Sequence, residues 1–233
     1  ALKPHFAQAY NNQGNAQIGL GQWQNAISNY KKAIKHLPDY AEAFLNLGYA
    51  YGKLHSLDAQ QHALSQAVQL EPHNPIAHLT LAETLSKLGD PDKALEHYNK
   101  AIERRPNWRD AALFRGAHLK NMGHTQEAIK AYSDLLAQSP QCGEVYRQLS
   151  DLQPYTLDDP FTKAMEIHWA NSNVSSADRC QIGFGLYNVY EKAGKNEAAF
   201  DTLSAANRLR RSNLNYSIKR DLTLFNQIKS IQV

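Results

Sequence analysis

Apolar residues recur at spacings of three and four along most of the chain, which is the period of an amphipathic helix. The stretch 77–88 and the stretch 92–105 both show this pattern, and Gly89-Asp90-Pro91 separates them. Pro91 suits the first turn of a helix, whereas Pro106 ends one because proline cannot continue it. The pattern therefore predicts a pair of helices joined by a tight turn.

The same helix pair recurs with a period of 34 residues. Several independent series of positions share this period, which is very unlikely by chance. The series are Pro38, Pro72, Pro106 and Pro140; Gly14, Gly48, Ala82 and Gly116; Ala33, Ala67, Ala101 and Leu135; and Tyr30, Leu64, Tyr98 and Tyr132. One such pair cannot bury its own apolar face, so neighbouring pairs are expected to stack.

The small residues of the series have a packing reason. We expect the glycine series to lie where the two helices of a pair cross, with Ala26, Ala94 and Ala128 on the opposite side. A larger side chain there would overpack the contact, at a cost of about 1–3 kcal/mol. The second unit departs from the pattern at His55 and Gln60, so we expect a locally looser pair there.

These residues closely resemble the tetratricopeptide repeat (TPR) over residues 7–140. The diagnostic residues are Tyr10, Gly14, Gly21, Ala26, Tyr30, Ala33 and Pro38 in the first unit and Phe44, Leu47, Gly48, Tyr51, Ala67 and Pro72 in the second. The resemblance implies an all-α fold, a right-handed superhelix (α-solenoid) of helix hairpins. It also implies that the first helix of each unit lines the concave side.

The period fails after Pro140, although the helical pattern continues. We expect helices over 143–152 and 159–171, then a cap at Ser175 or Ser176 and a further hairpin that turns at Gly194. An apolar stripe over 217–231 predicts a helix that caps the stack. The predicted organisation is four hairpins over 1–140, a degenerate fifth over 141–174, a sixth over 175–211, and a capping helix over 212–233.

The later segments resemble the end of the repeat region in bacterial proteins that fuse TPRs to a sulfotransferase domain. The matching segments are Leu149–Leu152, Tyr155–Asp159, Tyr187–Gly194, Glu197–Phe200 and Ala206–Arg211, with Tyr216 and Leu224-Phe225. The resemblance implies that this chain is the non-catalytic half of a longer protein. The catalytic half would use phosphoadenosine phosphosulfate.

Composition narrows the partner classes. The 233 residues are 42% hydrophobic and 20% charged, which argues against disorder, and no run approaches the roughly 18 apolar residues that span a bilayer. A net charge of +3 is too small to imply nucleic acid. Two distant cysteines, Cys142 and Cys180, fit a reducing, cytoplasmic compartment. The start shows no initiator Met and no signal peptide, which suggests a processed or excised chain.

We find no catalytic or cofactor motif. The two G-x-G triplets, Gly19-Leu20-Gly21 and Gly183-Phe184-Gly185, follow no strand, and no phosphate-binding loop is present. The ten histidines lack metal-ligand spacing, so we interpret them as scattered surface or groove residues and predict no metal and no cofactor. We therefore expect the chain to be a binding module and not an enzyme.

The concave face is the candidate site. Asparagine amides both donate and accept, so Asn12, Asn15 and Asn46 could clamp a peptide backbone, with Tyr49, Leu79 and Phe114 as apolar contacts. The other candidate groove residues are Asn11, Lys53, Thr80, Glu83, Lys87, Lys120 and Asn121. The alternative interpretation is that these amides are repeat consensus and merely solvated.

A known form of this groove grips the acidic C-terminus of heat-shock chaperones with two asparagines and three basic residues. Asn15 and Asn46 match the asparagines, but Asn11, Ile76 and Thr80 stand uncharged at the basic positions. Charge-assisted bonds to a terminal carboxylate are then lost, so we predict no tight binding of that motif. The partner is expected to be another peptide or protein segment, and the second resemblance implies a downstream sulfotransferase domain as a further partner. A stand-alone adaptor, an enzyme of another class with merely structural repeats, and oligomerisation through the end helices are the alternatives.

Overall fold

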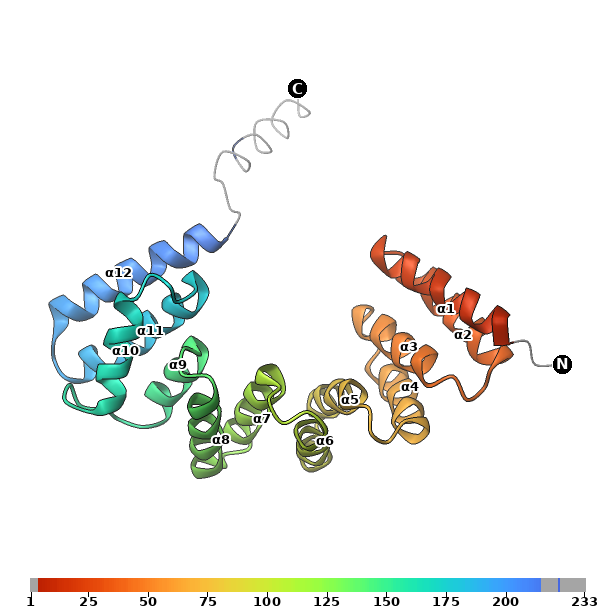
Figure 1. Ribbon diagram of the computed structural model, residues 1–233, viewed down its shortest axis with the longest axis horizontal. Coiled ribbons are helices and arrows are strands. Elements are labelled where there is room, and N and C mark those ends of the chain that lie inside the picture. Colours follow the sequence, from red (N-terminus) through yellow and green to blue (C-terminus); the bar gives the residue numbers. More distant parts are fainter. Residues whose placement is uncertain (1–3, 215–221, 223–233) are drawn as a thin grey trace, which may run out of the picture. The chain divides into compact units, whose positions relative to one another are not determined.

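A computed structural model describes residues 4–214 and 222, and within them the fold is all-α. The described residues form twelve helices and no strand (Figure 1). The helices are α1 (Pro4–Gly19), α2 (Trp23–His36), α3 (Ala41–Lys53), α4 (Leu57–Leu70), α5 (Pro75–Leu88), α6 (Pro91–Arg104), α7 (Arg109–Asn121), α8 (Thr125–Gln138), α9 (Gly143–Leu152), α10 (Pro160–Ala170), α11 (Ser176–Lys192) and α12 (Asn196–Asn213).

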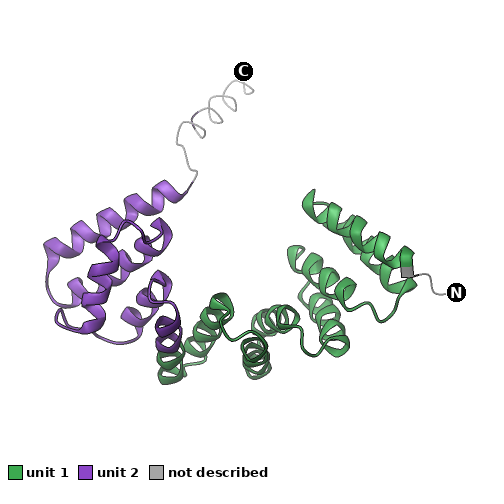
Figure 2. Ribbon diagram, viewed as in Figure 1, with its two compact units in different colours: residues 1–131 green, residues 132–233 purple. Residues whose placement is uncertain are grey.

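The chain divides into two compact units, residues 1–131 and 132–233 (Figure 2). The boundary falls inside α8 and not after Pro140. In the second unit, Leu136 from the later part of α8 packs against the cluster around Tyr146 and Met165. The hydrophobic core of the second unit therefore begins before the last proline of the 34-residue series.

Helix ends lie where the turn signals predict them. Each of the four periodic prolines stands two residues beyond a helix, since α2, α4, α6 and α8 end at 36, 70, 104 and 138. The Asn74 side chain accepts from the backbone N–H groups of Ile76 and Ala77, at 3.0 and 3.1 Å, and so caps α5. Gly89 ends α5 in the left-handed region, with φ 82°.

Two members of the glycine series, Gly14 and Gly48, lie at helix crossings and are closest to the Tyr30 series, and Gly48 also lies near the backbone oxygen of Gln60, the alanine position of its unit. A Cβ on Gly14 would lie 2.5 Å from Cε1 of Tyr30, and a Cβ on Gly48 would lie 2.7 Å from Cγ of Leu64. Tyr30 and Leu64 are almost fully buried in this position. The glycine thus makes room for the largest core side chain of its own hairpin.

The second hairpin shows no loosening at its crossing. Gln60 is 8% exposed, and a Cβ on Gly52 would lie 2.6 Å from its Nε2 atom. Gly52 therefore supplies the space that an alanine at position 60 would have left. His55 adopts φ 56°, whereas the same turn carries glycine in the first, third and fourth units. A left-handed conformation costs a non-glycine residue roughly 1–2 kcal/mol. Any loss of stability in the second hairpin therefore arises in this turn.

Unit 2 keeps a helix hairpin in α11–α12, but α9 and α10 both pack against α11, which replaces the regular contacts. Gly143 begins α9 and donates its N–H to Oδ1 of Asp178 on α11, at 2.9 Å. The Ser175 hydroxyl accepts from the N–H of Asp178 and caps α11, which confirms one of the two predicted caps. The predicted capping helix over 217–231 lies outside the described residues, except for position 222.

Candidate functional site

The first helices of successive pairs lie next to one another in unit 1. Asn11 of α1 reaches Glu42 of α3, and Leu45 of α3 packs on the core cluster that includes Leu79 of α5. Ser86 of α5 is 3.1 Å from Nδ1 of His118 on α7. All candidate groove residues belong to these four helices, α1, α3, α5 and α7. We call the surface that these residues form the first-helix face.

Side-chain amides form a connected network at the α1–α3 end of this face. Asn46 Nδ2 donates to Oδ1 of Asn11 and of Asn15, at 3.0 and 3.2 Å, and Asn11 Nδ2 donates to Oε1 of Glu42 at 3.0 Å. The Tyr30 hydroxyl donates to Oδ1 of Asn15 at 2.8 Å. Among the described residues, Asn15 Nδ2 and Asn46 Oδ1 make no hydrogen bond within this network, which leaves one donor group and one acceptor for a ligand.

The predicted residues differ in how far a ligand can reach them. Asn11 is fully buried, because its amide links α1 to α3, and Leu79 is 6% exposed within the core. Both residues therefore support the face from below. The others are exposed or half-buried: Asn12, Asn15, Asn46, Tyr49, Lys53, Thr80, Glu83, Lys87, Phe114, Lys120 and Asn121.

Large apolar side chains stand exposed on three successive first helices. Tyr49 of α3 is 45% exposed, Ile76 of α5 is 49% exposed, and Phe114 of α7 is 43% exposed. Lys53 lies over the Tyr49 ring, with Nζ 5.0 Å from its centroid. Exposed apolar surface of this kind marks binding sites when it gathers on one face.

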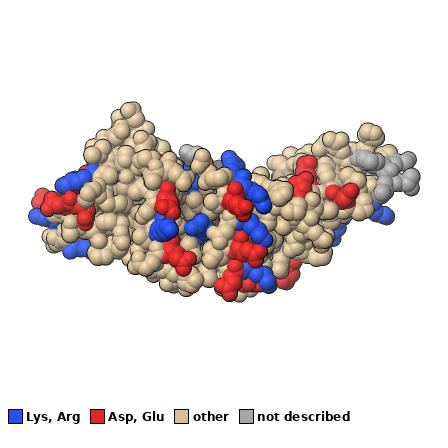
Figure 3. Space-filling model, turned by 60° about the horizontal axis from the view of Figure 1, so that its bottom comes forward, with Lys and Arg blue, Asp and Glu red and all other residues tan. Residues whose placement is uncertain are grey.

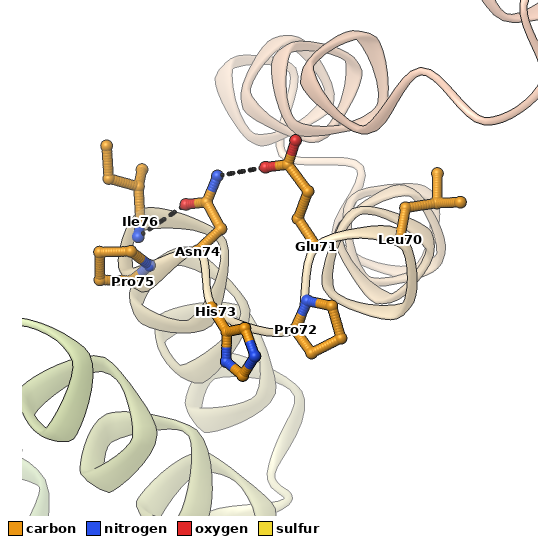
Figure 4. Close-up of a pocket in the computed structure, with 7 residues that line it drawn as sticks. All are labelled: Leu70, Glu71, Pro72, His73, Asn74, Pro75 and Ile76. Atoms are coloured by element: carbon orange, nitrogen blue, oxygen red, sulfur yellow. Dashed lines mark hydrogen bonds between the residues drawn. The ribbon is translucent and has the colours of Figure 1, made fainter.

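A pocket of about 580 Å³ opens in the loop between α4 and α5 (Figure 4). Its lining runs from Leu70 to Ile76, and Asn74 Nδ2 donates to Oε2 of Glu71 across it at 3.0 Å. Ile76 lines this pocket, and it also stands at one of the positions where the chaperone-binding clamp would need a cation. An apolar group bound at Ile76 could therefore extend into the pocket.

Sequence reasoning missed Glu42 and the role of Tyr30 in the network. The 34-residue period identifies Tyr30 only as a repeat position, and Glu42 is not among the predicted groove residues. The signal for Glu42 was available, because it stands in the first turn of α3, four residues before Asn46. Residues four apart share a helix face.

The histidines were interpreted as surface or groove residues, and for two of them this is wrong. His78 is 2% exposed and His118 is 5% exposed. Nε2 of His78 lies 3.1 Å from the Pro72 carbonyl, so this nitrogen carries the proton and Nδ1 accepts from Nδ1 of His97, at 2.8 Å. Nε2 of His118 likewise donates to the Pro91 carbonyl, at 2.8 Å. The buried His78 ring thus bonds a loop carbonyl, and the buried His118 ring bonds a carbonyl at the start of α6.

Burial lowers the pKa of His97 to about 4, with the charges of His78 and Lys100 acting in the same direction. The pKa of His78 is also lowered, chiefly by burial. Both rings are therefore neutral at pH 7. No group of three His, Cys, Asp or Glu side chains in the described part of the chain is arranged to hold a metal ion.

On the face drawn in Figure 3, acidic and basic side chains lie next to one another. On α6, Lys93 lies 2.6 Å from Asp90 and Lys100 lies 2.5 Å from Glu96. This helix therefore presents no uninterrupted cationic stripe. Of the helices described, none has the length and apolar character needed to cross a membrane.

Comparisons with known proteins identify the repeat. Residues 14–54 match a family model described as TPR repeat, and residues 57–117 match one described as tetratricopeptide repeat. Both models describe repeats and not an enzyme. No curated protein matches the chain.

Solved structures agree on the fold. A crystal structure of MamA has a TM-score of 0.62 at 19% identity and covers 84% of this chain and 96% of its own. YrrB, titled a TPR protein with an unusual peptide-binding site, has a TM-score of 0.58 at 20% identity, over 68% of this chain and 82% of its own.

The first TPR of Spaghetti (RPAP3), bound to the HSP90 peptide SRMEEVD, has a TM-score of 0.51 at 20% identity. This match covers 52% of the present chain and 97% of the other. At these identities the likeness concerns the fold. The chain thus has the all-α fold of TPR proteins and contains tetratricopeptide repeats over residues 14–54 and 57–117.

Proposed function

We propose that the first-helix face binds an extended peptide or protein segment. The observation that carries the proposal is the row of exposed apolar side chains on α3, α5 and α7, next to an amide network. Two of the structural neighbours are described with a peptide-binding site or a bound peptide. These descriptions concern those proteins, and they support the same use of the fold here.

The amides would bind the peptide backbone, and the apolar side chains would bind peptide side chains. Asn15 Nδ2 can donate to a peptide carbonyl, and Asn46 Oδ1 can accept from a peptide N–H. Because Tyr30 and Asn11 fix the two amides, a ligand meets groups that have already lost their rotational freedom. Tyr49 and Phe114 would then bury apolar peptide side chains.

The test is a selection of random peptides against the whole chain, followed by affinity measurements with the selected peptides. We expect Tyr49→Ala and Phe114→Ala each to weaken binding about tenfold, since both remove exposed anchors. Leu20→Ala is the matched control, because Leu20 is 71% exposed but lies after α1, away from the face. Equal losses in all three variants, or no selected peptide, would overturn the proposal.

We further propose that α9–α10 and α11–α12 are the fifth and sixth repeats, and that the chain recruits a partner for a sulfotransferase-type enzyme. The enzyme link is supported by the resemblance of segments such as Tyr187–Gly194 and Ala206–Arg211. The reading frame of the natural gene tests it: a sulfotransferase domain after Val233 supports the link, and a stop codon there favours a stand-alone adaptor. Dimerisation in light scattering would favour the third alternative, an oligomerisation module.

A further inference from the structure

One carboxylate on the first-helix face lacks a hydrogen-bond or ion-pair partner within the part of the chain that the structure describes. Glu83 of α5 is half-buried, and among the described residues it makes no hydrogen bond and no ion pair within 4.0 Å. Its equivalent two repeats earlier is Asn15, which is held by Tyr30 and Asn46. The side-chain oxygen at this position therefore accepts hydrogen bonds in the first repeat but accepts none from the described residues in the third.

One repeat position beside Glu83 is aromatic where the matching position beside Asn15 is an amide. Tyr98 takes the place of Tyr30, and Phe114 takes the place of Asn46, by the 34-residue period. Burial and the nearby charge of Glu83 raise the pKa of the Tyr98 hydroxyl, so the two side chains are neighbours. Phe114 remains 43% exposed, although an aromatic ring of this size would normally be covered.

The cation that acts on Glu83 is Lys87, one helical turn further along α5. Its charge opposes the effect of burial on Glu83, but the balance still leaves the pKa of this carboxyl above its usual range. Lys87 is exposed and lies beyond ion-pair distance. A half-buried carboxylate whose negative charge is not fully compensated by its neighbours favours the approach of a positive charge.

We propose that Glu83 selects the bound peptide by pairing with an arginine or lysine side chain whose stem lies on Phe114. This inference rests on the proposed function, since it names the class of peptide that the same face takes. Arginine fits best, because its guanidinium can bind a carboxylate in a bidentate manner and stack on an aromatic ring. The specificity is then opposite in charge to that for an acidic C-terminus.

The test uses four libraries of capped decapeptides that differ only in a fixed central residue: Arg, Lys, Gln or Glu, with uncharged residues elsewhere. We expect the whole chain to bind the Arg and Lys libraries about tenfold more tightly than the Gln and Glu libraries. Glu83→Gln should erase this preference without lowering the melting temperature, because it removes an unpaired charge. Glu103→Gln, an exposed carboxylate on α6, is the matched control and should keep the preference.

Two outcomes would overturn the inference while leaving peptide binding intact: equal binding of all four libraries, or a basic preference that survives Glu83→Gln. If none of the libraries binds, the proposed function fails as well. Lys87→Ala separates an internal role from an external one. If Glu83 serves the peptide, loss of this competing cation should strengthen binding of the Arg library; if Glu83 only serves Lys87, the variant should be less stable and bind no better.

Discussion

Single residues at equivalent repeat positions meet different environments. The Tyr30 hydroxyl donates to Asn15 at 2.8 Å, whereas the buried Tyr132 hydroxyl finds no hydrogen-bond partner among the described residues. Burial raises the pKa of both phenols, that of Tyr30 to about 12. The tyrosine hydroxyl at this repeat position is thus hydrogen-bonded in one repeat and lacks a partner among the described residues in another.

This difference predicts opposite effects of one substitution. Tyr30→Phe should lower the free energy of unfolding by about 1 kcal/mol, since it removes a made hydrogen bond and leaves Asn15 short of a donor. Tyr132→Phe should be neutral or stabilising, because it removes a buried hydroxyl that lacks a partner. Urea denaturation of both variants provides the measurement. A larger loss for Tyr132→Phe than for Tyr30→Phe would contradict the assignment.

The His78–His97 pair predicts acid sensitivity. An unfolded histidine takes up a proton near pH 6.5, but folded His97 resists protonation until about pH 4, so stability should fall as the pH drops through this window. Because His97 is only half-buried, we expect a loss of about 1–2 kcal/mol. His97→Gln should flatten the dependence by this amount in unfolding measurements at pH 7 and pH 5. His62→Gln, at an exposed position on α4, should leave the slope unchanged.

At the scale of helices, close crossings depend on glycine only where a neighbour is near. A Cβ on Gly143 would lie 2.1 Å from the backbone oxygen of Asp178, whereas a Cβ on Gly19 would meet nothing within 4 Å. The contact at Gly143 is with backbone, which cannot rotate away. The α9–α11 junction therefore tolerates no side chain at this point.

Gly143→Ala should destabilise the protein by about 2–3 kcal/mol, by overpacking and by disturbing the bond from Gly143 N–H to Asp178. Gly19→Ala should be neutral or stabilise by up to about 1 kcal/mol, since alanine is the better helix former. Thermal unfolding of the two variants decides the matter. Comparable melting temperatures would mean that α9 and α11 can separate without cost.

The elements could be predicted from the sequence because helix period, turn residues and the 34-residue spacing all agree. The site could be predicted less well. A period places Asn11 and Leu79 on the correct helices, but it does not reveal that one amide is buried by a long-range bond to Glu42 or that Leu79 belongs to the core. Burial of His78 was equally hidden, since it depends on a carbonyl in the loop before α5.

At the scale of the whole molecule, we expect the charges at particular positions of the first-helix face to decide which peptides it takes. The chaperone-binding clamp needs cations where Asn11, Ile76 and Thr80 stand here, whereas the cations of this face, Lys53, Lys87 and Lys120, lie at other positions beside Glu42 and Glu83. The fold alone does not set this preference, because the RPAP3 domain with the same fold holds an acidic peptide.

We therefore expect no binding of the peptide SRMEEVD to the whole chain by calorimetry. The double variant Ile76→Lys with Thr80→Arg should gain measurable affinity, because it restores two charge-assisted contacts at exposed or half-buried positions. Low-micromolar binding by the unmodified chain would show that the missing cations do not matter.

The fit of Gln60 over Gly52 has a consequence for how such arrays can be rebuilt or recombined. Gln60 and Gly52 are complementary, and neither residue alone suits the other hairpins. The glutamine side chain needs the space that the glycine leaves, and without the glutamine that space would be a cavity. If α4 were grafted behind another first helix that lacks a glycine at the position of Gly52, the Gln60 side chain would clash with that helix. This module can be exchanged only as a whole.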